Sequence, residues 1–232
     1  RDYKVTGVQT CALPILHITF GIAWIGASFY FVFLENALNR TEGIREELAG
    51  NLWAVHGGGF YYLEKYKVAP ASIPKHLHWF KYEAYFTWIT GFALLFIVYY
   101  FNASAMLIDK NVMNIPVYAG IGIGIGSFIV AWIFYDKLCK SRLIKNATLF
   151  SIIGFCLLIA FAFAYSSIFS GRAAYIHFGA MLGSIMVANV FFVIIPSQKA
   201  MVKAAKEGKP LNPELGKHAG LRSLHKIGRA HV

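Results

Sequence analysis

The sequence predicts an all-α fold, a polytopic bundle of transmembrane helices with five spans. Three observations predict it. The chain of 232 residues is 57% hydrophobic and only 14% charged, whereas a typical soluble domain has about 25% charged residues. Five apolar segments are long enough to cross a bilayer, which takes about 20 residues of helix. The charged residues gather in the connections between these segments.

The predicted spans contain no Asp, Glu, Lys or Arg and cover residues 16–34, 84–101, 116–135, 147–169 and 173–195. Lys and Arg are plentiful after the first, third and fifth spans and sparse in the other connections. Because basic residues favour the cytoplasmic side, the N-terminal side is expected outside and the tail in the cytoplasm. A basic excess placed in this way indicates membrane topology, and we expect a lipid bilayer and no nucleic acid as a partner.

The two ends of the chain read differently from the rest. Residues 1–15, "RDYKVTGVQTCALPI", and residues 227–232, "IGRAHV", resemble the translation of sequencing-library adapters read in opposite directions. Both are expected to be artefacts and are set aside from fold reasoning. Residues 16–226 are then expected to be an N-terminal membrane domain, truncated at its end.

The long connection between the first two spans has several local signals. The polar stretch 40–50 predicts a helix that ends at Gly50, and the prolines within 69–76 predict a turn. In the third span, "GIGIGIG" over 120–126 contains the pairs Gly120/Gly124 and Gly122/Gly126. Small residues at this spacing predict close packing against a neighbouring helix.

His56-Gly57-Gly58-Gly59 resembles the oxyanion-hole string of lipases and esterases. That string serves a Gly-x-Ser-x-Gly nucleophile elbow, which the sequence lacks, so a hydrolase is not expected. The glycines instead predict a sharp turn or a close backbone approach. The sequence also has no zinc-ligand spacing and no Cys-x-x-Cys-His, so neither a metal site nor covalent haem is predicted in this chain.

His17 and His177 lie inside predicted spans, where ionisable residues are rare and usually functional. By the predicted topology both lie near the outer face, at one depth. Gly21, Ser28, Gly179 and Gly183 are expected to leave room beside them. The two histidines are therefore candidate axial ligands of a b-type haem. An interhelical hydrogen bond or hydration at the interface is the alternative.

Long stretches of the chain resemble one known family. They are "GIAWIGASFYFVFLEN" (21–36), "LWAVHGGGFYYLEKYKVAP" (52–70), "HLHWFKYEAYFTWITGFALL" (76–95), "FSGRAAYIHFGAMLGSIMVANVFFVIIP" (169–196) and "RSLH" (222–225). They look like the membrane domain of bacterial membrane-bound urate oxidase, also called urate hydroxylase. The resemblance implies about eight membrane helices in the bacterial inner membrane, followed by a cytochrome c domain that alone would carry c-type haem.

The implied activity is oxidation of urate to 5-hydroxyisourate in purine degradation, with electrons passed to a cytochrome c. Urate is a planar anion, so its site should offer a cation, hydrogen-bonding groups and an aromatic face. The residues give four catalytic candidates, Arg172, His177, Asn189 and Trp24, with His17 beside them. The alternative is a non-catalytic haem-binding electron-transfer module. A transporter is less favoured because the spans show no paired repeat.

Overall fold

The computed structural model describes residues 3–70 and 72–226, with residues 3–10 as backbone only. Five helical segments are long and apolar enough to cross a membrane: Cys11–Ala37, Tyr82–Tyr100, Val117–Lys140, Ala147–Ile168 and Gly171–Lys206. Each contains one of the five predicted spans to within one residue at either end, and the helical fold class is confirmed. The predicted artefact at 227–232 lies outside the described residues, and the assignment of 1–15 stays a prediction.

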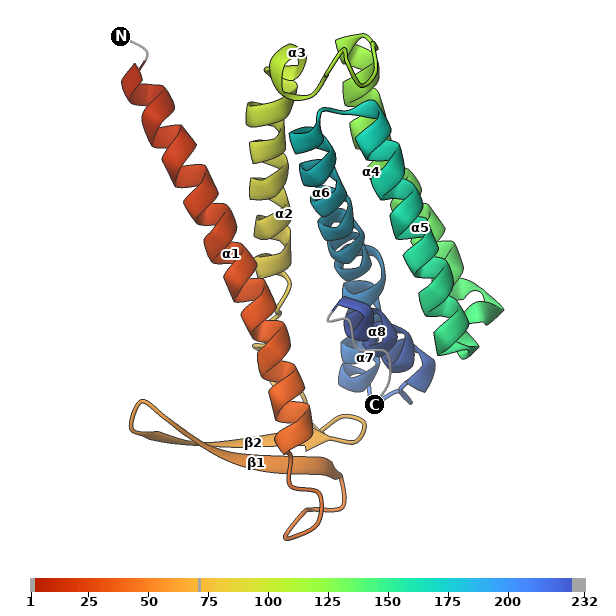
Figure 1. Ribbon diagram of the computed structural model, residues 1–232. Helices are drawn as coiled ribbons and strands as arrows, with labels where there is room; N and C mark the ends of the chain where they lie inside the picture. Colours follow the sequence, from red (N-terminus) through yellow and green to blue (C-terminus); the bar gives the residue numbers. More distant parts are fainter. Residues whose placement is uncertain (1–2, 71, 227–232) are drawn as a thin grey trace. The chain divides into compact units, whose positions relative to one another are not determined.

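The helices are mostly long and joined by short connections (Figure 1). Their bounds are α1 Tyr3–Ala37, α2 Tyr82–Leu95, η1 Phe96–Tyr100, α3 Ala103–Met106, α4 Val117–Lys140, η2 Arg142–Lys145, α5 Ala147–Ile168, α6 Gly171–Asn189, η3 Val190–Ile194, α7 Ile195–Lys206 and α8 Pro213–Lys226. Both η1 and η3 are π-helical and continue the helix before them.

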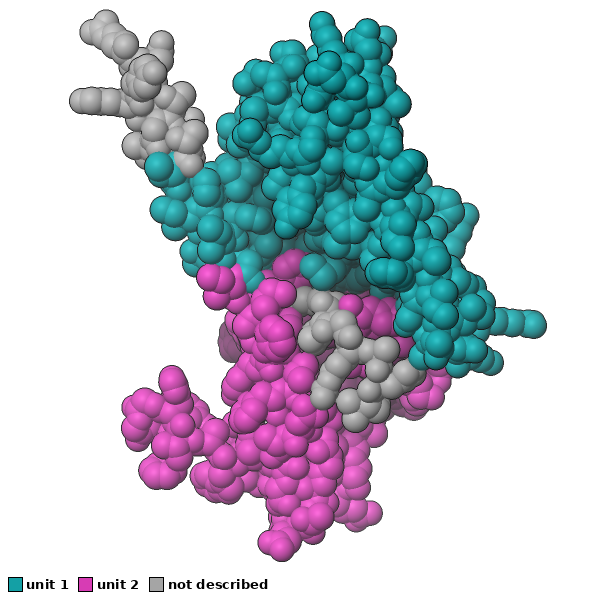
Figure 2. All heavy atoms as spheres, viewed as in Figure 1, with its two compact units in different colours: residues 1–21, 82–190 teal, residues 22–81, 191–232 magenta. Residues whose placement is uncertain are grey.

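The chain divides into two compact units (Figure 2). The first unit comprises residues 1–21 and 82–190, and within it α6 packs against α2, α4 and α5. The buried core of this bundle is mainly aromatic and aliphatic, and includes Leu95, Leu107, Phe128, Phe169 and Met181. Many other apolar side chains of the long helices face outward, for example Phe155 and Phe163 of α5, as expected for helices surrounded by lipid.

The second unit comprises residues 22–81 and 191–232 and contains a β-hairpin that the sequence analysis did not predict. Strands β1 (Leu48–His56) and β2 (Gly59–Tyr66) pair antiparallel, with Trp53 opposite Tyr62 and Val55 opposite Phe60. Gly57 and Gly58 form the turn with φ of 57° and 80°, the positive values that a two-residue type I′ turn requires. The expectation of a sharp turn at the glycine run is confirmed.

The helix predicted over residues 40–50 is wrong. Residues 40–47 form bends and a turn, and residues 48–50 already belong to β1. The charged side chains of this stretch pair across the hairpin, with Arg45 Nη2 2.6 Å from Glu64 Oε2. Asn39 and Asn51 exchange two backbone hydrogen bonds of 2.8 and 3.1 Å. These contacts to distant residues outweigh the local helix propensity of the stretch.

Ser170 fixes the start of α6, and its loss should destabilise the first unit. Its hydroxyl donates to the Met106 carbonyl at 2.8 Å and accepts from the Ala173 amide at 3.4 Å. We expect Ser170→Ala to lower the free energy of unfolding by about 1–2 kcal/mol, because a helix cap is lost and a carbonyl is left unpaired. Thermal unfolding in detergent measures this. Ser166→Ala is the control, since that hydroxyl is exposed and bonds only within its own helix. Equal effects of the two substitutions would contradict the assignment.

Candidate functional site

The π-helical segment η1 directs two consecutive tyrosines into the bundle. A π-helical turn contains more residues than an α-helical one, which changes the direction of the side chains that follow it, and such turns are frequent at functional sites. In this bundle both Tyr99 and Tyr100 are buried, at 7% and 6% exposure. The Tyr100 hydroxyl thereby reaches the imidazole of His177 on α6, with 3.1 Å between Oη and Nε2.

Both ring nitrogens of His177 are hydrogen-bonded, and the partners determine the tautomer. The Ala173 carbonyl can only accept, so Nδ1 carries the hydrogen in the 2.8 Å contact with it. In the neutral ring, Nε2 is then the acceptor and the Tyr100 hydroxyl is the donor. His177 is fully buried, and this pairing satisfies its polar atoms where an unpaired one would be costly.

An aromatic cage surrounds the His177 ring. The ring centroids lie 4.8 Å away for Phe169, 5.7 Å for Tyr100 and between 6.0 and 6.2 Å for Tyr99, Phe128 and Tyr165. These residues come from η1, α4, α5 and the α5–α6 connection. The imidazole is therefore surrounded by aromatic rings, and its two nitrogens make the hydrogen bonds to Tyr100 and Ala173.

A second, partly buried hydroxyl pair involves Tyr165 of the same cage. Ser127 Oγ donates to the Gly124 carbonyl at 2.7 Å, so the Tyr165 hydroxyl donates to Ser127 Oγ at 2.7 Å. Gly124 makes the closest approach to the main pair: a Cβ there would lie 2.8 Å from Tyr100 Oη and 3.0 Å from His177 Nε2. The predicted close packing against a neighbouring helix is confirmed at Gly124, whereas Gly120 packs against the α3–α4 connection and Gly122 and Gly126 face open space.

His17 lies against the middle of α2. Its Nδ1 is 3.0 Å from the Thr87 carbonyl and 3.2 Å from Thr90 Oγ1, so Nδ1 carries the hydrogen. A Cβ on Gly91 would be 2.7 Å from the His17 ring. The room beside the two histidines thus comes from Gly91 and Gly124 on facing helices. The expected Gly179 and Gly183 have no heavy atom near their Cβ positions.

The expectation that His17 and His177 lie at one depth is wrong. His17 is level with Gly91 and His177 with Tyr100, and these nine positions correspond to about 13 Å along a helix. His177 also uses both ring nitrogens within the protein. The arrangement does not fit a haem held between the two histidines.

The structure separates the other predicted site residues. Arg172 is exposed at the start of α6, on a different side of the helix from His177. Asn189 is buried, donates to the Ile185 carbonyl at 3.0 Å, and lies about 18 Å along α6 from His177. Trp24 is buried in the other unit of the chain. Of the four catalytic candidates, only His177 belongs to the cage.

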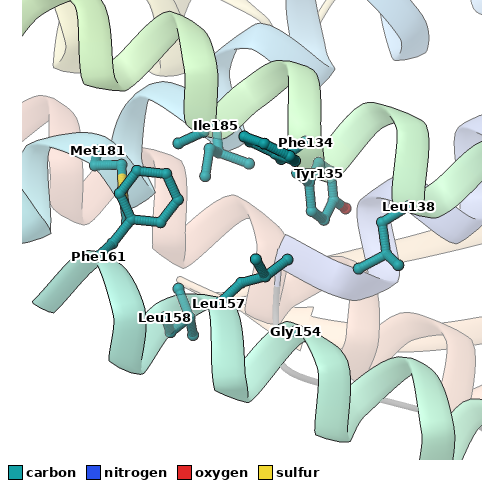
Figure 3. A pocket seen from close by; sticks show the side chains of 10 residues that line it. Phe134, Tyr135, Leu138, Gly154, Leu157, Leu158, Phe161, Met181 and Ile185 are labelled. Carbon is teal, nitrogen blue, oxygen red and sulfur yellow. The ribbon is translucent and has the colours of Figure 1, made fainter. Parts of the chain in front are cut away.

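A small groove of about 60 Å³ lies one helical turn from the cage, between α4, α5 and α6 (Figure 3). Ala131, Phe161 and Met181 line it at positions one turn from Ser127, Tyr165 and His177. Its other lining residues are apolar apart from Tyr135. Such a lining suits an apolar group and offers little to a polar anion. Among the described residues, no cluster of three or more His, Cys, Asp or Glu side chains could hold a metal ion.

Tyr100, Tyr165, Ser127 and Gly124 complete the site and were not singled out as site residues from the sequence. The sequence analysis found Gly124 only as a packing glycine. Tyr100 sits at the end of an apolar span, where tyrosines are common for reasons of solvation alone. A buried histidine needs a hydrogen-bond partner, so polar residues at the ends of the other spans are the signal that points to Tyr100.

The chain was compared with known proteins. The model of the family described as "Urate oxidase N-terminal" matches residues 4–227. The comparisons with curated proteins and with solved structures found no match. The matched range contains the cage, Arg172, Asn189 and both intramembrane histidines.

Gly124 allows a clean test of the cage, because Gly122 is a matched control on the same helix. Gly124→Ala places a methyl group against Tyr100 Oη and His177 Nε2, and overpacking of this kind costs about 1–3 kcal/mol. Gly122→Ala meets nothing within 4 Å and should be neutral or slightly stabilising, since Ala favours helix. Unfolding temperatures in detergent distinguish them. If Gly124→Ala were as stable as Gly122→Ala, the close approach would be wrong.

Proposed function

The chain belongs to the urate oxidase N-terminal family, and on this premise we propose that it oxidises urate to 5-hydroxyisourate and passes the electrons to a cytochrome c. The family match over residues 4–227 carries the proposal. The reaction adds one water to urate and releases two protons and two electrons. A site for it must bind a planar anion, accept protons and conduct electrons to the acceptor.

We propose that the Tyr100–His177 pair accepts a proton released in this reaction. Tyr100 can pass its hydroxyl hydrogen to Nε2 over the 3.1 Å contact while it accepts another hydrogen from the substrate side. The resulting imidazolium keeps its Nδ1–H bond to the Ala173 carbonyl, so only the proton moves. Tyrosine and histidine are established proton-transfer groups in enzymes. The hydroxyls of Ser127 and Tyr165 bond to each other, and that of Ser127 also bonds to the Gly124 carbonyl, so they are not assigned to this proton transfer.

Arg172 and His177 lie on different sides of α6, so we propose a separate role for Arg172. It shares an exposed face of α6 with Tyr175, three residues later. A guanidinium beside an exposed aromatic ring supplies the charge and the stacking surface that a planar anion requires. We propose that this pair makes the first contact with urate at the rim of the bundle.

The charge pattern supports an orientation with the N-terminal side outside in a bacterial inner membrane. Few charges occur in the connection after η1 and in the connection between α5 and α6, and the positive-inside rule assigns such connections to the outer side. These connections adjoin the helix ends that carry Tyr100, Tyr165 and Arg172. In this orientation the cage is nearer the outer face, where a soluble cytochrome c could accept electrons.

Removal of the Tyr100 hydroxyl should slow the chemical step. We expect Tyr100→Phe to lower kcat by about 10²–10⁴-fold with little change in KM, as for loss of a proton-transfer group. The assay is urate consumption coupled to ferricytochrome c reduction in membranes that contain the chain. Tyr165→Phe is the matched control, because it removes a buried hydroxyl from the same cage but leaves the His177 pair intact. Equal kcat values for the two variants would refute the assigned role.

Arg172→Ala should act on binding. Because the side chain is exposed at the start of its helix, we expect a normal fold and a raised KM with kcat retained, the signature of lost uniform binding. Arg172→Lys keeps the charge and should recover part of the affinity. The KM of both variants for urate, measured in the same assay, tests this. An Arg172→Ala variant with unchanged KM would remove Arg172 from the proposed site.

A further inference from the structure

The hairpin β1–β2 carries an exposed apolar face close to its turn. Residues that are directly opposite in an antiparallel pair share one face of the sheet. Trp53 and Val55 of β1 therefore lie on the same face as Tyr62 and Phe60 of β2. Their exposed fractions are 68% for Trp53, 66% for Val55, 78% for Phe60 and 45% for Tyr62. These four residues are called the apolar hairpin face below.

The tip of the hairpin has no charged residue, whereas its base is charged. Residues 52–63 contain no Asp, Glu, Lys or Arg, and Glu64, Lys65 and Lys67 follow directly. The Trp53 and Tyr62 rings are in contact, with centroids 4.7 Å apart. Their rings are apolar with one polar edge, the character that concentrates Trp and Tyr at the boundary between hydrocarbon and water.

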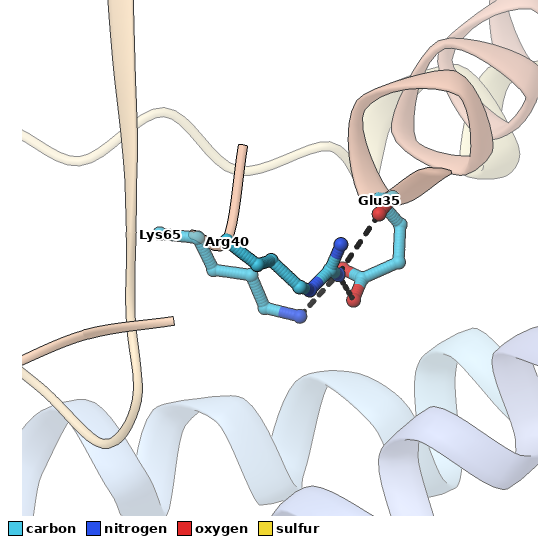
Figure 4. A network of polar contacts seen from close by, with 3 residues as sticks. All are labelled: Glu35, Arg40 and Lys65. Carbon is cyan, nitrogen blue, oxygen red and sulfur yellow. Dashed lines mark hydrogen bonds and ion pairs between the residues drawn. The ribbon is translucent and has the colours of Figure 1, made fainter. Parts of the chain in front are cut away.

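Ionic contacts hold the base of the hairpin at the end of a membrane span. Glu35 lies in the last turn of α1 and pairs with Lys65 of β2 and with Arg40, whose Nη2 is 2.8 Å from Glu35 Oε1 (Figure 4). The Asn39–Asn51 bridge joins the segment just after α1 to β1. Phe60 is five residues from Lys65, so the tip extends about 17 Å from this anchor. Within this unit the strands run across the direction of α1 (Figure 1).

A two-stranded hairpin with one apolar face is marginally stable in water by itself. A hairpin that crosses the end of a span and is anchored there extends along the membrane surface, within reach of lipid headgroups. The ionic groups at the base of the hairpin pair with one another and fix that end, while the exposed aromatic tip is suited to the boundary between hydrocarbon and water. Shape, position and aromatic character therefore agree on one partner, the bilayer itself.

We infer that the apolar hairpin face rests in the interfacial layer of the bilayer that the helices span. The hairpin is then a peripheral membrane anchor, which holds the connection between α1 and α2 against the lipid headgroups. This inference is independent of the proposed oxidase activity, because it concerns residues outside the cage and requires no substrate.

The test measures lipid contact of Trp53 directly in the whole chain. The protein is reconstituted in vesicles of phosphatidylcholine and phosphatidylglycerol with bromine either near the headgroup or deep in the acyl chain. Subtraction of the Trp53→Phe spectrum from that of the unsubstituted protein isolates the Trp53 emission. We expect blue-shifted emission that loses most of its intensity with shallow bromine and less with deep bromine. Emission at the wavelength of a hydrated indole, quenched by iodide and insensitive to bromine, would overturn the inference.

Two neighbouring reporters test which face is in contact. In the Trp53→Phe background, Phe60→Trp places an indole on the apolar hairpin face, and Tyr61→Trp places one on the opposite face at a position that is also exposed. Quenching by shallow bromine should be several-fold stronger at position 60. Equal quenching at both positions would overturn the assignment of the face. Blue-shifted emission at position 60 without any effect of bromine would assign the face to protein, such as a second copy of the chain, and would likewise overturn it.

Discussion

The hydrogen bond between Tyr100 and His177 is the contact on which the polar centre of the bundle depends. By the polar centre we mean the hydrogen-bonded pairs Tyr100–His177 and Ser127–Tyr165. A histidine buried in an apolar bundle must find its partners within the protein, because no water replaces them there. Three independent features of the chain meet this requirement. The π-helical turn η1 directs Tyr100 inward, Gly124 lets α4 approach closely, and the cap at Ser170 sets the start of α6 and therefore the direction of His177. A change in any of these features moves one end of the same hydrogen bond.

The sequence was sufficient for the spans and insufficient for the hairpin, and the reason is physical. Span length and the absence of charge are properties of each segment alone, so all five spans were predictable. Residues 40–50 have the composition of a polar helix, but Arg45 pairs with the distant Glu64, and Asn39 and Asn51, which flank the stretch, are bridged to each other. No local pattern contains such pairs. The glycine run was correctly read as a turn, which in hindsight was the strongest hairpin signal in this part of the chain.

The candidate site was predictable only in part, for a similar reason. His177 was identified because a histidine inside a span is unusual, but Tyr100 looked like an ordinary tyrosine at a span end. The π-helical turn shifts the side chains that follow it out of the 3.6-residue period, so helical periodicity does not predict that Tyr100 faces His177. Predicted topology assigns His17 to the outer side of the first span but does not fix its depth relative to the other helices. The contacts with Thr87 and Gly91 place it along α2 instead.

The polar centre ends abruptly within the bundle, and this bears on where protons can go. One turn further along α4, α5 and α6, the places of Ser127, Tyr165 and His177 are taken by Ala131, Phe161 and Met181. A proton placed on His177 therefore meets the apolar groove on that side, where a charge is strongly disfavoured. On the other side lie the ends of η1 and α5 and the start of α6, near the connections with few charges. For the proton of the proposed reaction, the arrangement favours return to the side from which it came.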